Sequence, residues 1–223
     1  MHEYSLAVAL FDYLPVLVAG LGTLCLAKAI SQRQAALAPV AWCAALAVPL
    51  GGACKASWKL LIALDQPPLP WLENLLFLLL APGFLTLAAC LHRATATSPQ
   101  SIGWGLVAWA AMAPFGALAA WLVWPEARWW FVWLLALTVL GSTALIIIAI
   151  RQARRLALPW PVPAALLYNL VAGFVLSGLS RLPPGESTAW LQEGINLTSQ
   201  AAFAYGAWQL ARALTSTPDR NLS

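Results

Sequence analysis

The feature that most constrains the fold of this chain is a series of seven apolar runs, each long enough to cross a lipid bilayer. A bilayer core about 30 Å thick requires about 20 apolar residues in a helix. The runs cover residues 6–29, 36–64, 69–92, 102–125, 128–151, 158–182 and 187–213. Hydrophobic residues make up 61% of the chain and charged residues 9%, whereas soluble domains contain about 25% charged residues. The sequence therefore predicts an all-α membrane protein, with seven transmembrane helices in a single domain over 1–223.

The basic residues predict how these helices are oriented. One set of loops and helix ends carries Lys28, Arg33, Arg93, Arg151, Arg154, Arg155, Arg212 and Arg220. The opposite side carries only Arg128 and Arg181, apart from two lysines inside the second run. Because cytoplasmic loops are enriched in Lys and Arg, we expect the N-terminus outside and the C-terminus, with a short tail at 214–223, in the cytoplasm. The basic pI of 9.1 thus reflects topology in a bacterial-type inner membrane, with the lipid bilayer and not nucleic acid as the partner.

Two stretches about 120 residues apart have similar sequences. Residues 67–74 and 183–193 both contain a Pro-Pro turn, then a Trp-Leu pair and a glutamate at the start of an apolar run. An offset of 122 aligns Gly51 with Gly173, and an offset of 119 aligns Gly22 with Gly141. These matches predict a duplicated three-helix unit in parallel orientation. Repeat 1 would cover about 6–92, a linker helix about 102–125, and repeat 2 about 128–213.

This three-plus-one-plus-three arrangement resembles the SWEET and PQ-loop transporters and their receptor-like relatives. Those families carry proline in corresponding helices of each unit, Trp on the second helix and Asn on the third. Residues at compatible places are Pro15, Pro49, Trp58, Asn74 and Asn196. The run at 128–151 departs from the pattern because it has no proline, and the Pro99-Gln100 pair falls in a predicted loop. The resemblance implies small-molecule transport or ligand sensing.

The candidate site consists of polar residues inside the predicted spans. A charge in hydrocarbon costs about 2.5–3.5 kcal/mol, so such residues are expected to face the bundle interior or a wet cavity. The candidates are Asp12, Lys55, Trp58, Lys59, Glu73, Asn74, Glu193 and Asn196. All the ionisable ones lie in the outer half, with Lys55 deepest at about 13 Å. Lys59 and Glu73 are shallow enough to extend towards the headgroups.

Two interpretations of these residues stay open. They form ion pairs that only fix helix packing, or they form a ligand or proton site opening to the outside. A carboxylate beside a lysine in a low dielectric can exchange protons, as proton-coupled carriers require. Parallel repeats are common among transporters, which bind substrate between the repeats. We therefore expect a transporter of a small molecule that works by alternating access, with Lys55, Glu73 and Glu193 as the core of its site.

Several other classes of function lack their characteristic residues. The chain has only two histidines, His2 and His92, predicted on opposite sides of the membrane, so neither a bis-histidine haem nor a metal site is expected. The last run has no lysine for a retinal Schiff base, and no nucleotide-binding fingerprint is present. No cofactor is expected, and enzyme activity is disfavoured. The alternatives are a seven-helix sensor or receptor, an accessory subunit of a membrane complex, and a lipid-modifying enzyme; a homo-oligomer or a membrane partner protein stays open.

Overall fold

The computed structural model describes residues 5–67, 69–96, 104–124, 126–180, 182–183 and 185–216, and for 104–110 only the backbone. Within these residues all regular secondary structure is helical. The elements are α1 (Leu6–Phe11), α2 (Tyr13–Arg33), the short 3-10 helix η1 (Ala35–Leu37), α3 (Ala38–Ala63), α4 (Pro70–Ala94), α5 (Trp104–Val123), α6 (Trp129–Arg155), α7 (Pro161–Leu179) and α8 (Glu186–Ser216). Arg181, Arg220 and most of the predicted tail, 217–223, lie outside the described residues.

Each predicted apolar run falls on a helix or, for the first run, on the pair α1 and α2. Five segments of the described chain are long and apolar enough to cross a bilayer: Leu6–Arg33, Ala35–Ala63, Pro70–Ala94, Trp129–Arg155 and Pro161–Leu179. α5 contributes a shorter apolar stretch, Ala111–Val123. α8 is less apolar because polar side chains occupy its face towards a cavity. The chain is therefore an all-α protein with several membrane-spanning helices.

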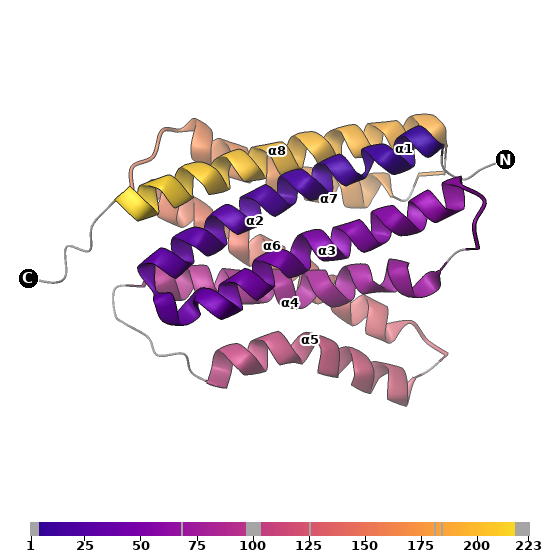
Figure 1. Cartoon of the computed structure of the whole chain (residues 1–223), viewed down its shortest axis with the longest axis horizontal. Helices are drawn as coiled ribbons and strands as arrows, with labels where there is room; N and C mark the ends of the chain where they lie inside the picture. The colour runs from indigo at the N-terminus through magenta and orange to yellow at the C-terminus, as the bar shows by residue number, and fades with distance from the viewer. Residues whose placement is uncertain are drawn as a thin grey trace, which may run out of the picture.

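Six of these helices form a ring, in which the interface of α6 with α7 is the least extensive. Going round the ring, α2 packs on α3, α3 on α4, α4 on α6, α6 on α7, α7 on α8, and α8 on α2 again. α5 lies outside the ring against α4 and α6, at the lower edge of Figure 1. The helices run along the long axis of the molecule (Figure 1). The ring surrounds a central space, which corresponds to the larger cavity described below.

Glycines allow the closest approaches between the ring helices. A methyl group at Gly22 of α2 would lie 2.7 Å from the ring of Phe203 in α8. A methyl group at Gly141 of α6 would lie 2.8 Å from the backbone nitrogen of Leu85 and 3.1 Å from Phe84, both in α4. Because lipid supplies no hydrophobic force between helices, such close packing of backbones is a main source of helix association in a membrane. Gly22 and Gly141 thus fix two of the tightest interfaces in the ring.

A proline inside α3 is accommodated by the neighbouring helix. Pro49 has no backbone N–H, so the carbonyl of Ala45 loses its usual helical donor. The hydroxyl of Thr23 in α2 donates a hydrogen bond to this carbonyl at 2.9 Å. Thr23 is completely buried. The contact therefore satisfies a buried acceptor that water cannot reach and joins α2 to α3.

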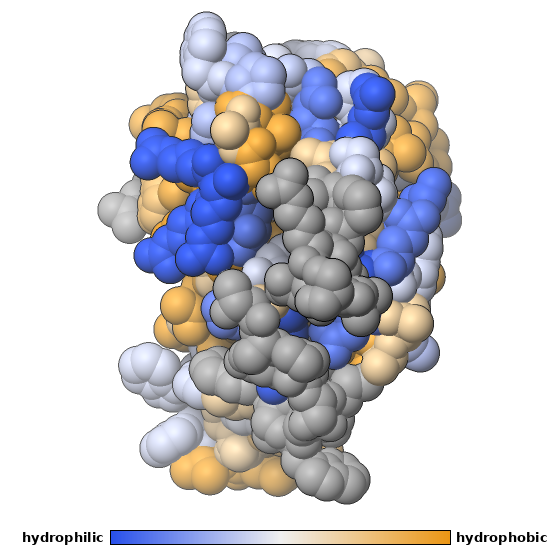
Figure 2. Space-filling view, turned by 90° about the vertical axis from the view of Figure 1, so that its left-hand side faces the viewer, coloured by the Kyte–Doolittle hydropathy of each residue, from blue (hydrophilic) through white to orange (hydrophobic). Residues whose placement is uncertain are grey.

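The two ends of the ring differ in chemistry. One end, which we call the basic end, carries Lys28, Arg33, Arg93, Arg151, Arg154, Arg155 and Arg212. Hydrophilic side chains gather on this end in the view of Figure 2. The acidic residues that the structure describes all belong to the half of the ring that is farther from the basic end: Asp12, Asp65, Glu73, Glu126, Glu186 and Glu193.

The half of the ring next to the basic end is filled by an apolar plug. It is made by completely or almost completely buried side chains, and its largest members are Leu26, Ile30, Leu37, Leu87, Leu91, Leu145, Leu166, Leu210 and Leu214. A second, smaller core joins α4, α5 and α6 through Ala81, Leu85, Ala113, Ala117, Leu134 and Leu137. The plug closes the central space on the side of the basic end and leaves the opposite half for the cavities described below.

Candidate functional site

Three buried ionisable side chains from three segments of the ring meet at one point. Lys59 Nζ lies 2.8 Å from Asp12 Oδ2 and 2.7 Å from Glu193 Oε1. The exposed fractions of these residues are 9% for Lys59, 7% for Asp12 and 6% for Glu193. We call this group the ion triad. Lys59 is shallow enough to extend towards the headgroups, but its ammonium is instead held inside the ring by two carboxylates.

The local sequence explains how the triad is positioned. Pro15 in the first turn of α2 cannot donate to the carbonyl of Phe11, and the helix is interrupted at Asp12 between α1 and α2. Gly52 of α3, two helical turns before Lys59, brings that helix close to the start of α2, where a methyl group would lie 2.8 Å from Val16. Glu193 comes from α8, which packs along α2. The triad therefore joins the first two ring helices to the last.

The charges of the triad do not balance. Two carboxylates share one ammonium, so its formal charge is −1 when all three groups are ionised. Glu193 Oε2 is the one buried side-chain oxygen or nitrogen in the described residues without a hydrogen-bond partner. A buried polar atom without a partner is rare in native proteins and needs an explanation, such as a bound proton, water or ligand. This oxygen is therefore the place where the triad can accept a further hydrogen bond.

Next to the triad lies a cavity of about 330 Å³, which we call the smaller cavity. It is bordered by all three triad residues and by Lys55, Asn196 and Gln200. Gln200 Nε2 donates to Asn196 Oδ1 at 3.4 Å, a long hydrogen bond within α8. The polar wall of this cavity is therefore supplied mainly by α3 and α8.

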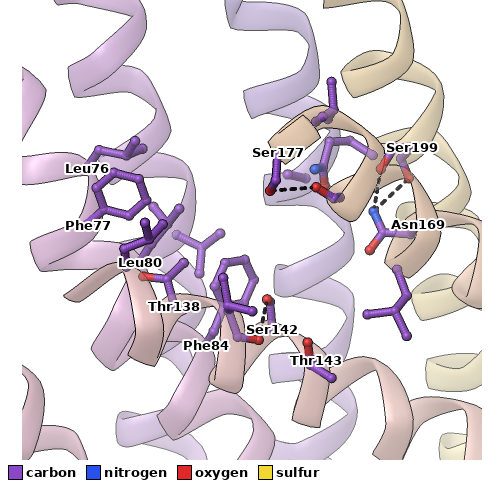
Figure 3. Close-up of a pocket in the computed structure, with 18 of the residues that line it drawn as sticks. Leu76, Phe77, Leu80, Phe84, Thr138, Ser142, Thr143, Asn169, Ser177 and Ser199 are labelled. Carbon is purple, nitrogen blue, oxygen red and sulfur yellow. Dashed lines mark hydrogen bonds between the residues drawn. The ribbon is translucent and has the colours of Figure 1, made fainter. Parts of the chain in front are cut away.

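A larger cavity of about 790 Å³ occupies the middle of the ring. Every ring helix contributes to its lining. Figure 3 shows apolar side chains of α4 at the left and Ser177, Asn169 and Ser199 at the right. Thr138, Ser142 and Thr143 of α6 lie below, from beside the α4 side chains towards the middle. A volume of this size lies within the range of about 300–1,000 Å³ that is typical of small-molecule sites.

The hydroxyl groups of this lining bond within their own helices. Thr138 donates to the Leu134 carbonyl, Ser142 to that of Val139, and Ser177 to that of Gly173. Since a donating hydroxyl still has acceptor capacity, these groups can accept hydrogen bonds from a ligand. On the opposite wall the amide nitrogen of Asn169 donates to Ser199 of α8, at 2.8 Å to Oγ and 3.0 Å to the carbonyl.

Two charged side chains border the larger cavity without forming an ion pair. Lys55 lines both cavities, and Glu73 lines the larger one. Within the described parts of the chain, neither side chain has a hydrogen bond or a salt bridge. Glu73 lies in the first turn of α4, where the helix dipole favours a carboxylate. The site thus contains one neutralised lysine, Lys59, and one lysine available to a ligand, Lys55.

The structure separates the predicted site residues into three sets. The first set is the ion triad, Asp12, Lys59 and Glu193. The second set lines a cavity without belonging to the triad and consists of Lys55, Glu73 and Asn196. The third set, which lines neither cavity, consists of Asn74 and Trp58. Sequence reasoning missed several further polar lining residues: Thr138, Ser142, Ser177, Ser180, Gln192 and Gln200. A signal was present for one of them, because Glu193, Asn196 and Gln200 have the i, i+3, i+7 spacing of one helix face.

No cluster of three or more His, Cys, Asp or Glu side chains suited to a metal ion occurs in the part of the chain that the structure describes.

Comparison with protein-family models, curated proteins and solved structures finds no match to this chain. What the protein does must therefore be argued from the cavities and their charges.

Proposed function

We propose that the protein is a transporter of a small molecule, with its binding site in the central space of the helix ring. The observation that carries this proposal is the larger cavity, which every ring helix lines and which the apolar plug closes on the side of the basic end. A cavity inside a membrane protein that is closed at one end is one of the two states that alternating access requires. Lys55, Glu73 and the ion triad supply its charged groups.

In the proposed arrangement, seven transmembrane helices form two three-helix units that are joined by α5. Two contacts support this duplication. Gly22 packs on Phe203, and Gly141 packs on Phe84. An offset of 119 residues aligns Gly22 with Gly141 and Phe84 with Phe203. The interface of α2 with α8 and that of α4 with α6 therefore use matching residues, as expected for two copies of one unit that face each other.

The charge distribution supports the proposed orientation. The basic end collects seven of the lysines and arginines in the described residues and none of the described acids. By the positive-inside rule this end faces the cytoplasm of a bacterial-type inner membrane, so the N-terminus is outside. The cavities then extend from the middle of the ring to its outer half, and the plug separates them from the cytoplasm.

Cysteine accessibility tests this proposal and separates a transporter from a receptor or an accessory subunit. The background variant replaces Cys25, Cys43, Cys54 and Cys90, all of which are free thiols. Two reporters are then introduced singly, Ser177→Cys in the larger cavity and Ala41→Cys in the completely buried core around the plug. Oriented vesicles receive a membrane-impermeant maleimide on one side at a time.

A transporter should show labelling of Ser177→Cys from the outside and slower labelling of Ala41→Cys from the cytoplasmic side, because the plug must open during the cycle. Leu17→Cys, on the exposed flank of α2, is the lipid-facing control and should stay unlabelled from both sides. A receptor with a fixed plug would show labelling of Ser177→Cys only. Reaction of Ser177→Cys from the cytoplasmic side alone would overturn the proposed orientation.

A further inference from the structure

Lys55 and Glu73 are opposite charges that line one cavity without forming an ion pair among the described residues. Gly51 of α3 packs on Leu76 and Leu79 of α4, and Gly83 of α4 packs on Ala44 and Val48 of α3. These contacts set an antiparallel register in which residue numbers of the two helices add up to about 129, so Lys55 is level with Glu73 and Asn74. The two charges therefore occupy one depth of the ring.

Nevertheless, the ammonium of Lys55 and the carboxylate of Glu73 do not meet. The salt bridges of the described residues use Lys59, and Lys55 and Glu73 are in none of them. Both residues are half-buried. A charge that has lost part of its water is stabilised by a partner of opposite sign, because removing an ion from water costs free energy. A single ligand that carries an anionic and a cationic group would give both side chains a partner at once, without adding net charge to the site.

The rest of the larger cavity fits an apolar group. Its lining includes the phenylalanines Phe77, Phe84, Phe131, Phe174 and Phe203. Phe77 and Phe131 stack edge to face with their ring centroids 5.2 Å apart, so α4 and α6 present a rigid aromatic wall. The cavity therefore combines a pair of opposite charges with an apolar compartment. This combination is complementary to an amphiphile.

The cavity also reaches the outer flank of the ring between α6 and α7. The lining residues on these two helices include three that are well exposed: Leu135 by 37% and Val139 by 43% on α6, and Phe174 by 59% on α7. Gly173 of α7 has no atom within 4 Å of the position where a side chain would begin. Since α6 is anchored to α4 and α7 to α8, this flank is the open seam of the ring.

We propose that the ligand is a zwitterionic amphiphile, with an ammonium group and a phosphate or carboxylate on an apolar chain, and that it enters from the bilayer between α6 and α7. Its anionic group binds Lys55, its ammonium group binds Glu73, and its chain lies against the phenylalanines. This inference rests on the proposed function, because it takes the central cavity as the ligand site.

The test uses a lysophosphatidylethanolamine with a photoactivatable diazirine in its acyl chain. The full-length protein is placed in nanodiscs of phosphatidylglycerol, irradiated and analysed by peptide mass spectrometry. Crosslinks are expected on α6 and α7, and unlabelled lysophosphatidylethanolamine should compete. Lysophosphatidic acid, which lacks the ammonium, and free phenylalanine, which lacks the chain, should compete at least about tenfold less well. Equal competition by lysophosphatidic acid would overturn the proposal that the ligand is a zwitterion.

Variants test the two charges separately from the fold. Lys55→Gln and Glu73→Gln should each reduce crosslinking about tenfold or more, because each removes one charged contact. The double exchange Lys55→Glu with Glu73→Lys should recover part of the signal, since the ligand can bind in the reverse sense. Thermal unfolding of each variant reports whether the fold is kept. Crosslinking that is unchanged in both single variants would overturn the assignment of the charges.

A matched glycine pair tests the route. Gly173→Trp places a bulky ring beside the cavity, whereas Gly178→Trp places it one and a half turns farther along α7, outside the lining. Neither glycine has a neighbour within 4 Å, so both variants are expected to fold. Gly173→Trp should block crosslinking and Gly178→Trp should not. If free phenylalanine competes fully and Gly173→Trp has no effect, the proposed route from the bilayer is refuted. The cysteine experiment still decides, independently, whether the protein is a transporter.

Discussion

Removal of the triad's cation should destabilise the fold strongly. Lys59→Met keeps the length and packing of the side chain but leaves Asp12 and Glu193, which now share the ammonium at 2.8 and 2.7 Å, without a cation. Breaking a buried ion pair by removing one partner costs about 3–5 kcal/mol. Proton uptake by one carboxylate limits the loss, so we expect about 3 kcal/mol. At about 2–4 °C per kcal/mol for a chain of this size, the midpoint of thermal unfolding should fall by about 6–12 °C.

The matched control for this variant lies one helical turn away. Lys55→Met makes the same chemical change on the same face of α3, but Lys55 has no ion pair in the described residues. Its removal should change stability by less than about 1 kcal/mol, or increase it by relieving an unpaired charge. Thermal unfolding in detergent, followed by the fluorescence of the 13 tryptophans, measures both variants under one condition.

A rescue variant completes the series. Lys59→Met combined with Asp12→Asn and Glu193→Gln removes all three charges and should recover most of the lost stability, because uncharged amides can hydrogen-bond to one another. Equal destabilisation by Lys59→Met and Lys55→Met would refute the reasoning, since it would mean that ion pairing does not distinguish the two lysines. Failure of the neutral triple variant to recover stability would show that Lys59 acts through packing and not through charge.

Three further predictions concern packing between helices. Gly141→Ala should destabilise the protein by about 1–3 kcal/mol, because its methyl group would lie 2.8 Å from a backbone nitrogen of α4. Gly173→Ala should be neutral, or stabilise the protein by up to about 1 kcal/mol through helix propensity. Resistance to unfolding by SDS ranks the two variants. Thr23→Val should cost about 1 kcal/mol in chemical unfolding, because it removes the donor to the carbonyl that a helix proline leaves unpaired. Asn169→Leu should cost about 0.6 kcal/mol, the average of interhelical hydrogen bonds in membranes, and it should speed hydrogen exchange in α7 because that helix loses a bond to α8.

The sequence predicted where the helices lie because bilayer thickness sets the length of apolar runs. It did not predict the interruption at Asp12, which needs the combined effect of Pro15 and of burial against α8. It also identified Asp12, Lys59 and Glu193 as site candidates from the cost of charge in hydrocarbon. Which acids contact Lys59 could not be predicted, because that depends on α8 packing beside α2.

Glu73 and Glu193 illustrate this limit. Sequence similarity places them within one position of each other in the two stretches, each just inside a helix after a Pro-Pro turn. In the structure Glu193 binds Lys59 at 2.7 Å, whereas Glu73 borders the larger cavity without an ion pair among the described residues. In the proposed duplication, matching positions share a helix and a depth, but their partners come from different neighbours in the ring. Similarity therefore predicts position and leaves the contacts open.

The differences between the two proposed units are concentrated where the ligand site is proposed. Gly51 of α3 packs closely on α4, with a methyl position 2.6 Å from Leu80, while its counterpart Gly173 of α7 meets no atom within 4 Å. Lys55, which has no ion pair among the described residues, has the uncharged Ser177 as its counterpart. The first unit thus supplies charge on a tightly packed pair of helices, and the second supplies an uncharged, loosely packed helix beside an opening. A site that must hold a charged head group and admit an apolar chain needs both properties, and an exact two-fold repeat could not supply them on different walls of one cavity.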